Sequence, residues 1–235
     1  LINWWDAVGV KLCEGFGQTE AMGLIITDPQ NRRIGSIGQP AGEVEVKIGG
    51  NDELLIKAAG CTPGYYNRPD KTAELWQDGW LHTGDKVRID DDGFIFITGR
   101  VKDYFKTIQG KFVAPPPIEG RFADNPHSEQ QCLLGRGYSK TVMVTVLNEP
   151  SRLLPKEEVE AAALATVESI NADIEKHARI GAIIFSQTPW TIENEILTPT
   201  MKIRREQIEN TFGEDAERLA RDGAEQGAIQ LHWFD

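Results

Sequence analysis

Two segments of the chain alternate apolar and polar residues on either side of a tight turn. Residues 43–58, EVEVKIGGNDELLIKA, do so around a Gly-Gly-Asn-Asp turn, and residues 86–100 do so around the Asp-Asp-Asp-Gly turn at 90–93. An Asp-Gly step next to an alternating run is a strong signal for a β-hairpin with one buried face. The first part of the chain is therefore predicted to consist largely of short antiparallel strands.

The remaining elements follow from apolar periodicity and from turn residues. Residues 8–13, VGVKLC, are predicted to form a strand that runs into a polar turn at 14–20, and a short helix capped by Asp70 is predicted at 70–76. After Gly99 strands and helices alternate; the predicted strands are 104–108, 131–135 and 141–147, and the predicted helices are 117–123, 155–179 and 203–222. We therefore predict an α+β fold in two domains, residues 1–98 and residues 99–235.

The helix from Pro155 has the clearest pattern. Proline suits the first helical position, and Glu157 and Glu158 favour the positive end of the helix dipole. Five apolar residues recur at spacings of three and four, Val159, Ala163, Val167, Ile170 and Ile174. The pattern predicts a helix packed on a sheet, which is a structural role only.

Composition excludes several classes of protein. The chain has 25 basic and 36 acidic side chains, so its formal net charge is 25 − 36 = −11. Such a chain does not attract nucleic acid through its overall field. No uncharged apolar stretch approaches the length of about 18 residues that a transmembrane helix needs. Three separated cysteines without a CxxC pair favour neither disulfides nor zinc and are typical of a reducing compartment, so we expect a cytoplasmic protein.

Two polar clusters occur in the first domain. In residues 15–20, GFGQTE, an aromatic ring can stack on a base, a threonine can bind a phosphate oxygen and a glutamate can hold Mg²⁺. In residues 78–85, DGWLHTGD, Asp85 can accept two hydrogen bonds from the vicinal hydroxyls of a ribose. Alone, each cluster has a plainer interpretation, a polar turn after a strand and a carboxylate that orders its loop.

Two further clusters are basic. Residues 99–111 contain one arginine and three lysines, and residues 197–205, LTPTMKIRR, present Lys202 just before a helix. Each has a plain alternative as a solvated basic segment. In this order, however, the four clusters are far more specific than any one of them.

The four clusters resemble motifs of the superfamily of AMP-forming acyl-CoA synthetases, firefly luciferase and peptide-synthetase adenylation domains. GFGQTE is similar to its Tyr/Phe-Gly-x-Thr-Glu motif, and DGWLHTGD to its Thr/Ser-Gly-Asp motif. GRVKDYFK at 99–106 is similar to its Gly-Arg-x-x-Asp hinge motif. Residues 64–72 add a fifth match, to Gly-Tyr-x-x-x-Pro-x-x-Thr.

The resemblance implies a role for each matched residue. It implies a nucleotide site formed by Phe16, Gly17, Thr19, Asp85 and Arg100. Phe16 would stack on the adenine, Thr19 would contact the AMP phosphate and Glu20 would bind Mg²⁺. Asp85 and Arg100 would hold the ribose hydroxyls.

The same resemblance implies roles for residues of the second domain and of the hinge. Lys102 would be the hinge residue of a small mobile α/β domain. Lys202 would be the catalytic lysine of adenylation, and Lys106 and Gly110 would line the thiol side in the second half-reaction.

The chain also departs from the family pattern. The last motif usually reads Ser-Gly-Lys and here reads Thr-Met-Lys, whereas residues 109–115 look like the long-chain fatty acyl-CoA branch. The phosphate loop of the family has no counterpart in these residues, and the chain begins with leucine. We therefore expect the C-terminal portion of such an enzyme, inactive alone, whose missing parts permit peripheral membrane association.

The resulting hypothesis is an ATP-dependent acyl-CoA ligase. It would convert a fatty or aryl carboxylic acid to an acyl-AMP and transfer the acyl group to coenzyme A, with ATP/AMP, Mg²⁺ and coenzyme A as cofactors and no nucleic-acid partner. Two alternatives remain open: an adenylation domain that loads a carrier protein, and a non-catalytic nucleotide-binding remnant.

Overall fold

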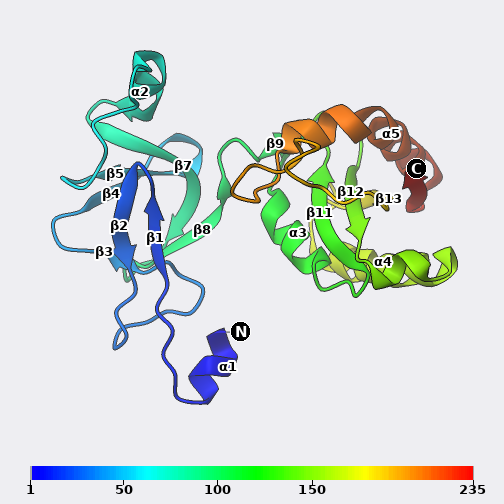
Figure 1. The fold of residues 1–235 in the computed structure, drawn as a ribbon, viewed down its shortest axis with the longest axis horizontal. Coiled ribbons are helices and arrows are strands. Elements are labelled where there is room, and N and C mark those ends of the chain that lie inside the picture. The colour runs from blue at the N-terminus through cyan, green and yellow to red at the C-terminus, as the bar shows by residue number, and fades with distance from the viewer. Residues whose placement is uncertain (1, 235) are drawn as a thin grey trace. The chain divides into compact units, whose positions relative to one another are not determined.

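The computed structural model describes residues 2–234, and the chain divides into two compact units (Figure 1). Unit 1 ends at Lys102 and unit 2 begins at Asp103, slightly later than the expected boundary at Gly99. The fold is mixed, with antiparallel sheets in unit 1 and a helix-covered sheet in unit 2, in agreement with the predicted α+β class. Among the described residues, no helix is long and apolar enough to cross a membrane.

Unit 1 consists of two antiparallel sheets. Its elements are α1 (Ile2–Ala7), β1 (Gly15–Gln18), β2 (Ala21–Ile26), β3 (Gln39–Pro40), β4 (Glu45–Ile48), the 3-10 helix η1 (Gly50–Asp52), β5 (Glu53–Lys57), α2 (Pro69–Leu75), β6 (Trp76–Gln77), β7 (Trp80–Ile89) and β8 (Ile95–Arg100). One sheet has the order β1-β2-β3; the other has the order β4-β5-β7-β6, and β8 also pairs with β7. The largest apolar cluster draws on both sheets, from Phe16 and Ile25 to Leu54, Ile56 and Ile95.

Both predicted hairpins are confirmed. Strands β4 and β5 pair with Glu45 opposite Lys57, on either side of the turn that η1 forms. Strands β7 and β8 pair with Asp85 opposite Arg100. The turn signals in the sequence therefore identified both of these hairpins correctly.

Two local predictions in unit 1 are wrong. Residues 8–13 are irregular, because Gly9 has a φ of +87° and no strand pairs with this segment; the first strand is β1. The cluster 14–20 is accordingly the start of a hairpin and not a turn after a strand. Helix α2 forms as expected, but Asp70 does not cap it; Arg68 is the N-cap residue, and Pro69 begins the helix.

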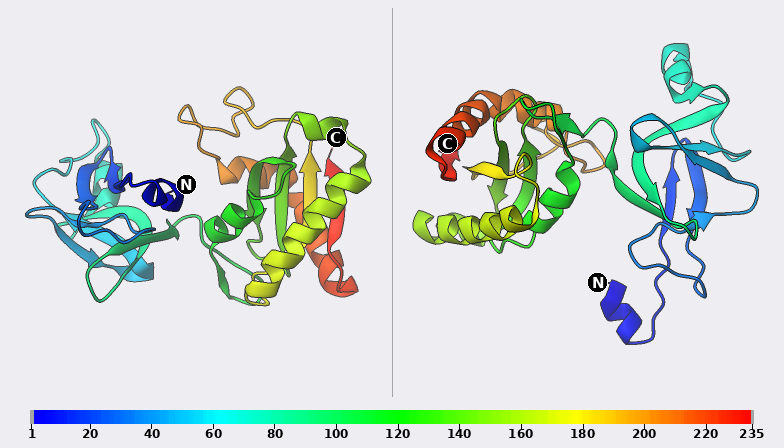
Figure 2. Two further views of the ribbon diagram at one scale, coloured as in Figure 1. Left: turned by 90° about the horizontal axis from the view of Figure 1, so that it is seen from below. Right: turned by 180° about the vertical axis from the view of Figure 1, so that it is seen from behind.

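Unit 2 is a four-stranded sheet covered by helices on both faces. Its elements are β9 (Phe105–Lys106), β10 (Phe112–Val113), α3 (Pro115–Phe122), β11 (Ser128–Leu134), β12 (Thr141–Leu147), the 3-10 helix η2 (Pro150–Leu153), α4 (Lys156–Asp173), β13 (Ile180–Ser186), α5 (Arg205–Gln226) and β14 (Gln230–Phe234). The order is β11-β12-β13-β14, with β11 antiparallel to β12 and the other pairs parallel. Helices α3 and α4 cover one face and α5 covers the other (Figures 1 and 2).

Strand β12 is buried along its whole length because both faces of the sheet are covered. Met143 and Leu147 join the apolar cluster beneath α3 and α4, whereas Val142 and Val144 join the cluster beneath α5. The predicted stripe of α4 is confirmed from Val159 to Ile170, and all four of these side chains are buried.

Helix α4 ends at Asp173 and not near 179 as predicted. The side chain of Asn171 pairs with the backbone of Ile180: its Nδ2 donates to the carbonyl, and its Oδ1 accepts from the N–H, both at 2.8 Å. This pair fixes the start of β13 beside the last turn of α4, so the chain must leave the helix between them. Ile174 lies just outside the helix but still packs against the same apolar cluster.

Two glycines of α5 give a test of the helix–sheet contact. A Cβ at Gly223 would lie 2.5 Å from the carbonyl oxygen of Gly181, whereas a Cβ at Gly213 would lie 3.7 Å from the hydroxyl of Tyr138. We expect Gly223→Ala to lower the free energy of unfolding by about 1–3 kcal/mol through overpacking. The matched control Gly213→Ala should raise it by about 0.5–1 kcal/mol through helix propensity. Urea unfolding of both variants measures the difference; stabilisation by Gly223→Ala would contradict the close approach.

Candidate functional site

Asp85 is a buried carboxylate on β7 that receives donors from two other segments of unit 1. Asp85 is 5% exposed. Gln18 donates from Nε2 to Oδ2 at 2.6 Å, and Arg100 donates from Nη1 to Oδ1 at 2.8 Å. Three of the sequence clusters, 15–20, 78–85 and 99–111, therefore each contribute one residue to a single hydrogen-bonded group.

The Thr-Gly-Asp sequence has a clear local structure. The hydroxyl of Thr83 donates to the carbonyl of Leu54 at 2.8 Å and accepts the N–H of Asp85 at 3.1 Å. Gly84 has a φ of +72°, a conformation that favours glycine. The threonine thus ties the turn to β5, and the glycine permits the backbone conformation that carries Asp85.

Gln18 was not among the predicted site residues. Its Nε2 also donates to the carbonyl of Thr83 at 2.8 Å, so one amide binds both the carboxylate and the strand that carries it. The register of β1 and β2 shifts between Phe16 and Gln18, and a Cβ at Gly17 would lie 2.7 Å from the N–H nitrogen of Gly23. Such a bulge redirects a side chain. The position of Gln18 inside the GFGQTE cluster was the only sequence signal.

Phe16, which the resemblance places against the adenine, is largely buried. The residue is 8% exposed and packs in the apolar cluster of unit 1. In contrast, Gly17 and Thr19 are exposed on the hairpin, and Thr19 is next to Glu20 at its tip.

Glu20 lies against the 64–72 segment. The hydroxyl of Tyr65 donates to its Oε1 at 2.5 Å, and its backbone carbonyl accepts the N–H of Thr62 at 2.8 Å. The hydrogen bond to Glu20, together with partial burial, raises the pKa of Tyr65 to about 12. A carboxylate acceptor stabilises the protonated phenol, so Tyr65 remains a donor across the physiological range.

The Gly-Tyr-x-x-x-Pro-x-x-Thr spacing also has a structural basis. The hydroxyl of Thr72 accepts the N–H of Tyr65 at 2.9 Å and donates to the carbonyl of Arg68 at 2.9 Å. A Cβ at Gly64 would lie 2.5 Å from a side-chain carbon of Thr72. The threonine therefore holds the loop that places Tyr65 beside Glu20.

A single protein carboxylate, that of Glu20, is enough for a magnesium ion whose other ligands come mainly from a nucleotide. Among residues 2–234, no group of three or more His, Cys, Asp or Glu side chains forms a complete metal cage. Mg²⁺ in phosphate-transfer sites usually takes one or two carboxylates together with phosphate oxygens and water. Tyr65 occupies only Oε1 of Glu20, so Oε2 is the oxygen that would be available to such an ion.

Lys106 and Gly110 lie on the β9–β10 hairpin of unit 2. The N–H of Gly110 donates to the carbonyl of Thr107 at 2.9 Å, and the φ of Gly110 is +72°, which suits the turn. The carbonyl of Lys106 accepts the N–H of Gly137 at 2.8 Å, which fixes the hairpin to unit 2. The ammonium of Lys106 lies 4.7 Å from the centre of the Phe112 ring.

Lys202 lies on a closed loop just before α5. Leu197 and Ile203 pair across its base, and the N–H of Thr198 donates to the carbonyl of Lys202 at 2.8 Å. The hydroxyl of Thr198 accepts the N–H of Lys202 at 3.0 Å. Lys202 is exposed, and within the described part of the chain its ammonium makes no hydrogen bond or ion pair. Lys102, the predicted hinge, is the last residue of unit 1 and is also exposed.

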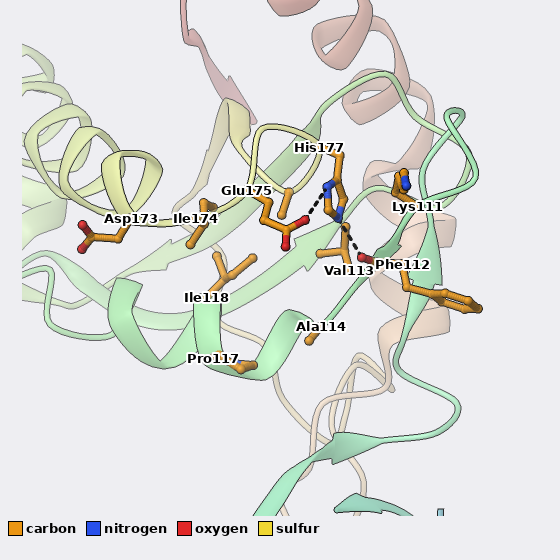
Figure 3. A pocket seen from close by; sticks show the side chains of 11 residues that line it. Lys111, Phe112, Val113, Ala114, Pro117, Ile118, Asp173, Ile174, Glu175 and His177 are labelled. Atoms are coloured by element: carbon orange, nitrogen blue, oxygen red, sulfur yellow. Dashed lines mark hydrogen bonds and ion pairs between the residues drawn. The ribbon is translucent and has the colours of Figure 1, made fainter. Parts of the chain in front are cut away.

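A pocket of about 410 Å³ lies in unit 2 between β10, the start of α3 and the segment after α4 (Figure 3). His177 spans part of it, with Nε2 3.0 Å from the carbonyl oxygen of Phe112 and Nδ1 3.1 Å from a carboxylate oxygen of Glu175. Lys111 lines the pocket, but the predicted catalytic lysines, Lys106 and Lys202, do not. The pocket is thus lined by none of the predicted site residues, although it shares Phe112 with the hairpin that carries Lys106.

The contact between Tyr65 and Glu20 predicts an unusual titration. At a pH of about 11, where an ordinary tyrosine is mostly ionised, Tyr65 should remain protonated. Glu20→Gln should move the pKa of Tyr65 back toward the usual 10.0, because the neutral amide no longer opposes the phenolate. Ultraviolet titration, with Tyr65→Phe to assign the signal and the exposed Glu43→Gln as control, measures the shift. An unchanged pKa in Glu20→Gln would contradict this contact.

Comparisons with known proteins agree with these observations. Residues 102–222, more than half of the chain, match the family described as the AMP-binding enzyme C-terminal domain. The long-chain-fatty-acid–CoA ligase FadD15 of Mycobacterium bovis is 27% identical over 92% of this chain and 39% of its own length. The carboxylic acid reductase of Mycobacterium tuberculosis is 31% identical over 94% of this chain and 20% of its own length.

A solved structure is also similar. The A-PCP didomain of carboxylic acid reductase from Segniliparus rugosus, determined in complex with AMP, is 26% identical with a TM-score of 0.76, over 95% of this chain and 33% of that one. The chain thus spans well under half the length of the relatives it matches. On the family match and on these similarities, the chain belongs to the AMP-binding enzymes, the superfamily of AMP-forming ligases, and contains their C-terminal domain.

Proposed function

We propose that this chain is the C-terminal portion of an AMP-forming acid–thiol ligase that activates a fatty or aryl carboxylic acid. The observation that carries the proposal is the Gln18–Asp85–Arg100 group, in which residues from three separate sequence clusters meet at one buried carboxylate. The similarity to long-chain-fatty-acid–CoA ligases supports a fatty acid as substrate and coenzyme A as acceptor.

Asp85 would bind the ribose of ATP. In the structure each of its oxygens accepts one hydrogen bond, from Gln18 and from Arg100. A carboxylate offers about four lone-pair sites, so each oxygen retains capacity for a ribose hydroxyl. Arg100 has a side chain that is 54% exposed and can itself donate to the sugar.

The first half-reaction must join two anions. A carboxylate oxygen attacks the α-phosphorus of ATP, a new P–O bond forms, and pyrophosphate leaves, which gives an acyl-AMP. Because the chain carries a net charge of −11, local cations must offset the repulsion. Lys202 would supply one, Thr19 would contact the phosphate, and Glu20 would hold the Mg²⁺ that neutralises phosphate charge.

The second half-reaction releases AMP. The thiol of coenzyme A gives its proton to water and attacks the acyl carbon; a C–S bond forms, and the C–O bond to AMP breaks with its electron pair going to the AMP that leaves. Lys106 and Gly110 would line the thiol side, and rotation of unit 2 about Lys102 would exchange Lys202 for Lys106 in the site. The division of the chain into compact units between Lys102 and Asp103 supports this hinge position.

A second candidate keeps the first half-reaction and changes the acceptor. Relatives named carboxylic acid reductases are similar over nearly the whole of this chain, so chains of this kind also occur in proteins not named as CoA ligases. An adenylation domain that passes its acyl group to a carrier protein would use the same nucleotide site. Thioester formation with free coenzyme A distinguishes the two candidates, and a chain that binds nucleotide without forming acyl-AMP would be a non-catalytic remnant.

Substitution of Asp85 tests the nucleotide site. In the complete protein, Asp85→Ala should weaken ATP binding by about 1.5–3 kcal/mol for each charge-assisted hydrogen bond lost. Asp92→Ala, which removes an exposed carboxylate from the turn of the same hairpin, should leave binding unchanged. Isothermal titration calorimetry with ATP measures both; equal affinity of Asp85→Ala and the parent would leave Asp85 as a residue that only orders its loop.

The two lysines test the division of labour between half-reactions. In the complete protein, Lys202→Ala should lower pyrophosphate exchange into ATP by about 10²–10³-fold and still convert supplied acyl-AMP to thioester. Lys106→Ala should preserve exchange and slow thioester formation. Lys176→Ala, an exposed lysine elsewhere in unit 2, is the control. If Lys202→Ala and Lys106→Ala depress both half-reactions equally, the assignment of one lysine to each step is wrong.

A further inference from the structure

Arg205, the first residue of α5, inserts a guanidinium into a junction of three elements of unit 2. Its side chain is 16% exposed. Nη2 donates to Oε1 of Glu119 on α3 at 2.7 Å, and Nη1 donates to the carbonyl of Leu133 on β11 at 2.6 Å. Nη1 also lies 3.0 Å from the sulfur of Cys132, whose pKa burial raises to about 12, so the thiol is neutral.

The ion pair of Arg205 and Glu119 completes an open sheet edge. Strand β11 is the edge strand of the unit 2 sheet. Oε1 of Glu119 accepts the N–H of Leu133 at 2.7 Å, and Arg205 donates to the carbonyl of the same residue. The pair therefore supplies the acceptor and the donor that a neighbouring strand would otherwise provide. The start of α5 is thus fixed to one residue of β11.

This junction lies at the end of the loop that carries Lys202. The other end of the loop is fixed by Leu197, which is buried beneath α5. The N–H of Arg204 donates to the carbonyl of Ile196 at 2.8 Å and so joins the two ends. Because the ammonium of Lys202 contacts no partner within residues 2–234, the loop backbone is what restricts the point from which this side chain extends.

We infer that Arg205, together with Glu119, is a positioning residue for Lys202 in the adenylation half-reaction. The inference rests on the proposed function of Lys202. A displacement of about 1 Å at a catalytic group can cost about 10²-fold in rate. A buried guanidinium that fixes three hydrogen-bond directions at the base of the loop restricts such displacement; a lysine at the same place, with a single nitrogen, does not.

Hydrogen exchange in the 235-residue chain tests the anchor without reference to catalysis. In Arg205→Lys, the amides of Thr198, Met201, Lys202 and Arg204 should exchange at least about tenfold faster, whereas the amides of β12 keep their rates. Arg204 is exposed and its side chain makes no hydrogen bond or ion pair in the described part of the chain, so Arg204→Lys is the matched control and should change neither.

Loop amides that exchange at the parental rate in Arg205→Lys would overturn the inference. If the whole of unit 2 exchanges faster in that variant, Glu119→Gln separates loss of the anchor from general destabilisation, because it removes the charge and keeps the side-chain volume. Selective acceleration of the loop in Glu119→Gln supports the anchor, and uniform acceleration across unit 2 refutes it.

Half-reaction kinetics in the complete protein then test the link to Lys202. Arg205→Lys should lower pyrophosphate exchange by about 10²-fold and leave thioester formation from supplied acyl-AMP within about twofold. Val167→Ala, which destabilises the core of unit 2 away from the loop, should alter neither rate selectively. In a Lys202→Ala background, Arg205→Lys should cause no further loss of exchange.

Each failure has its own signature. Equal depression of both half-reactions by Arg205→Lys, or an additive loss in the double variant, would overturn the positioning role. Normal exchange activity of Lys202→Ala would instead refute the proposed function of that lysine, whatever hydrogen exchange reports about the loop.

Discussion

A buried carboxylate requires hydrogen-bond donors, and unit 1 is organised around that requirement at Asp85. Gln18 and Arg100 satisfy one oxygen each, from opposite ends of the unit's sequence. The antiparallel register of β7 and β8 sets Arg100 opposite Asp85, and the bulge at Gly17 turns Gln18 toward it. Removing a donor from such a group leaves an unpaired charge in a low-dielectric site, which costs more than the lost bond itself.

Unit 2 also contains a buried charged pair, but there the pair binds the backbone of an edge strand. There Arg205 and Glu119 satisfy both backbone groups of Leu133 at a sheet edge, and the pair lies at the base of an exposed loop. In both units a charged pair anchors to a strand a segment that is proposed to contact substrate. The exposed residues proposed to act on substrate, Thr19 in unit 1 and Lys202 in unit 2, make few side-chain contacts of their own. Their positions therefore depend on the buried polar groups behind them.

Local pattern explains which parts of the fold could be predicted. The two hairpins of unit 1 and the buried stripe of α4 follow from alternation, turn residues and helical spacing, which depend on neighbours in sequence. The strand expected at 8–13 failed because a strand also needs a partner, and apolar residues alone do not specify one. The end of α4 was misplaced because the side chain of Asn171 pairs with Ile180, a contact that no spacing rule contains.

By itself, the sequence determined the fold class, the motif segments and the residue types available for nucleotide chemistry, because these depend on composition and short-range order. Only the tertiary structure decided which of those residues meet. It brought Gln18, absent from the predicted site, onto Asp85, and it enclosed Phe16 in the core. It also joined Tyr65 to Glu20 and Arg205 to the edge of β11. The physical reason is that burial and hydrogen bonding depend on which residues are neighbours in space. Strand register and helix packing determine those neighbours.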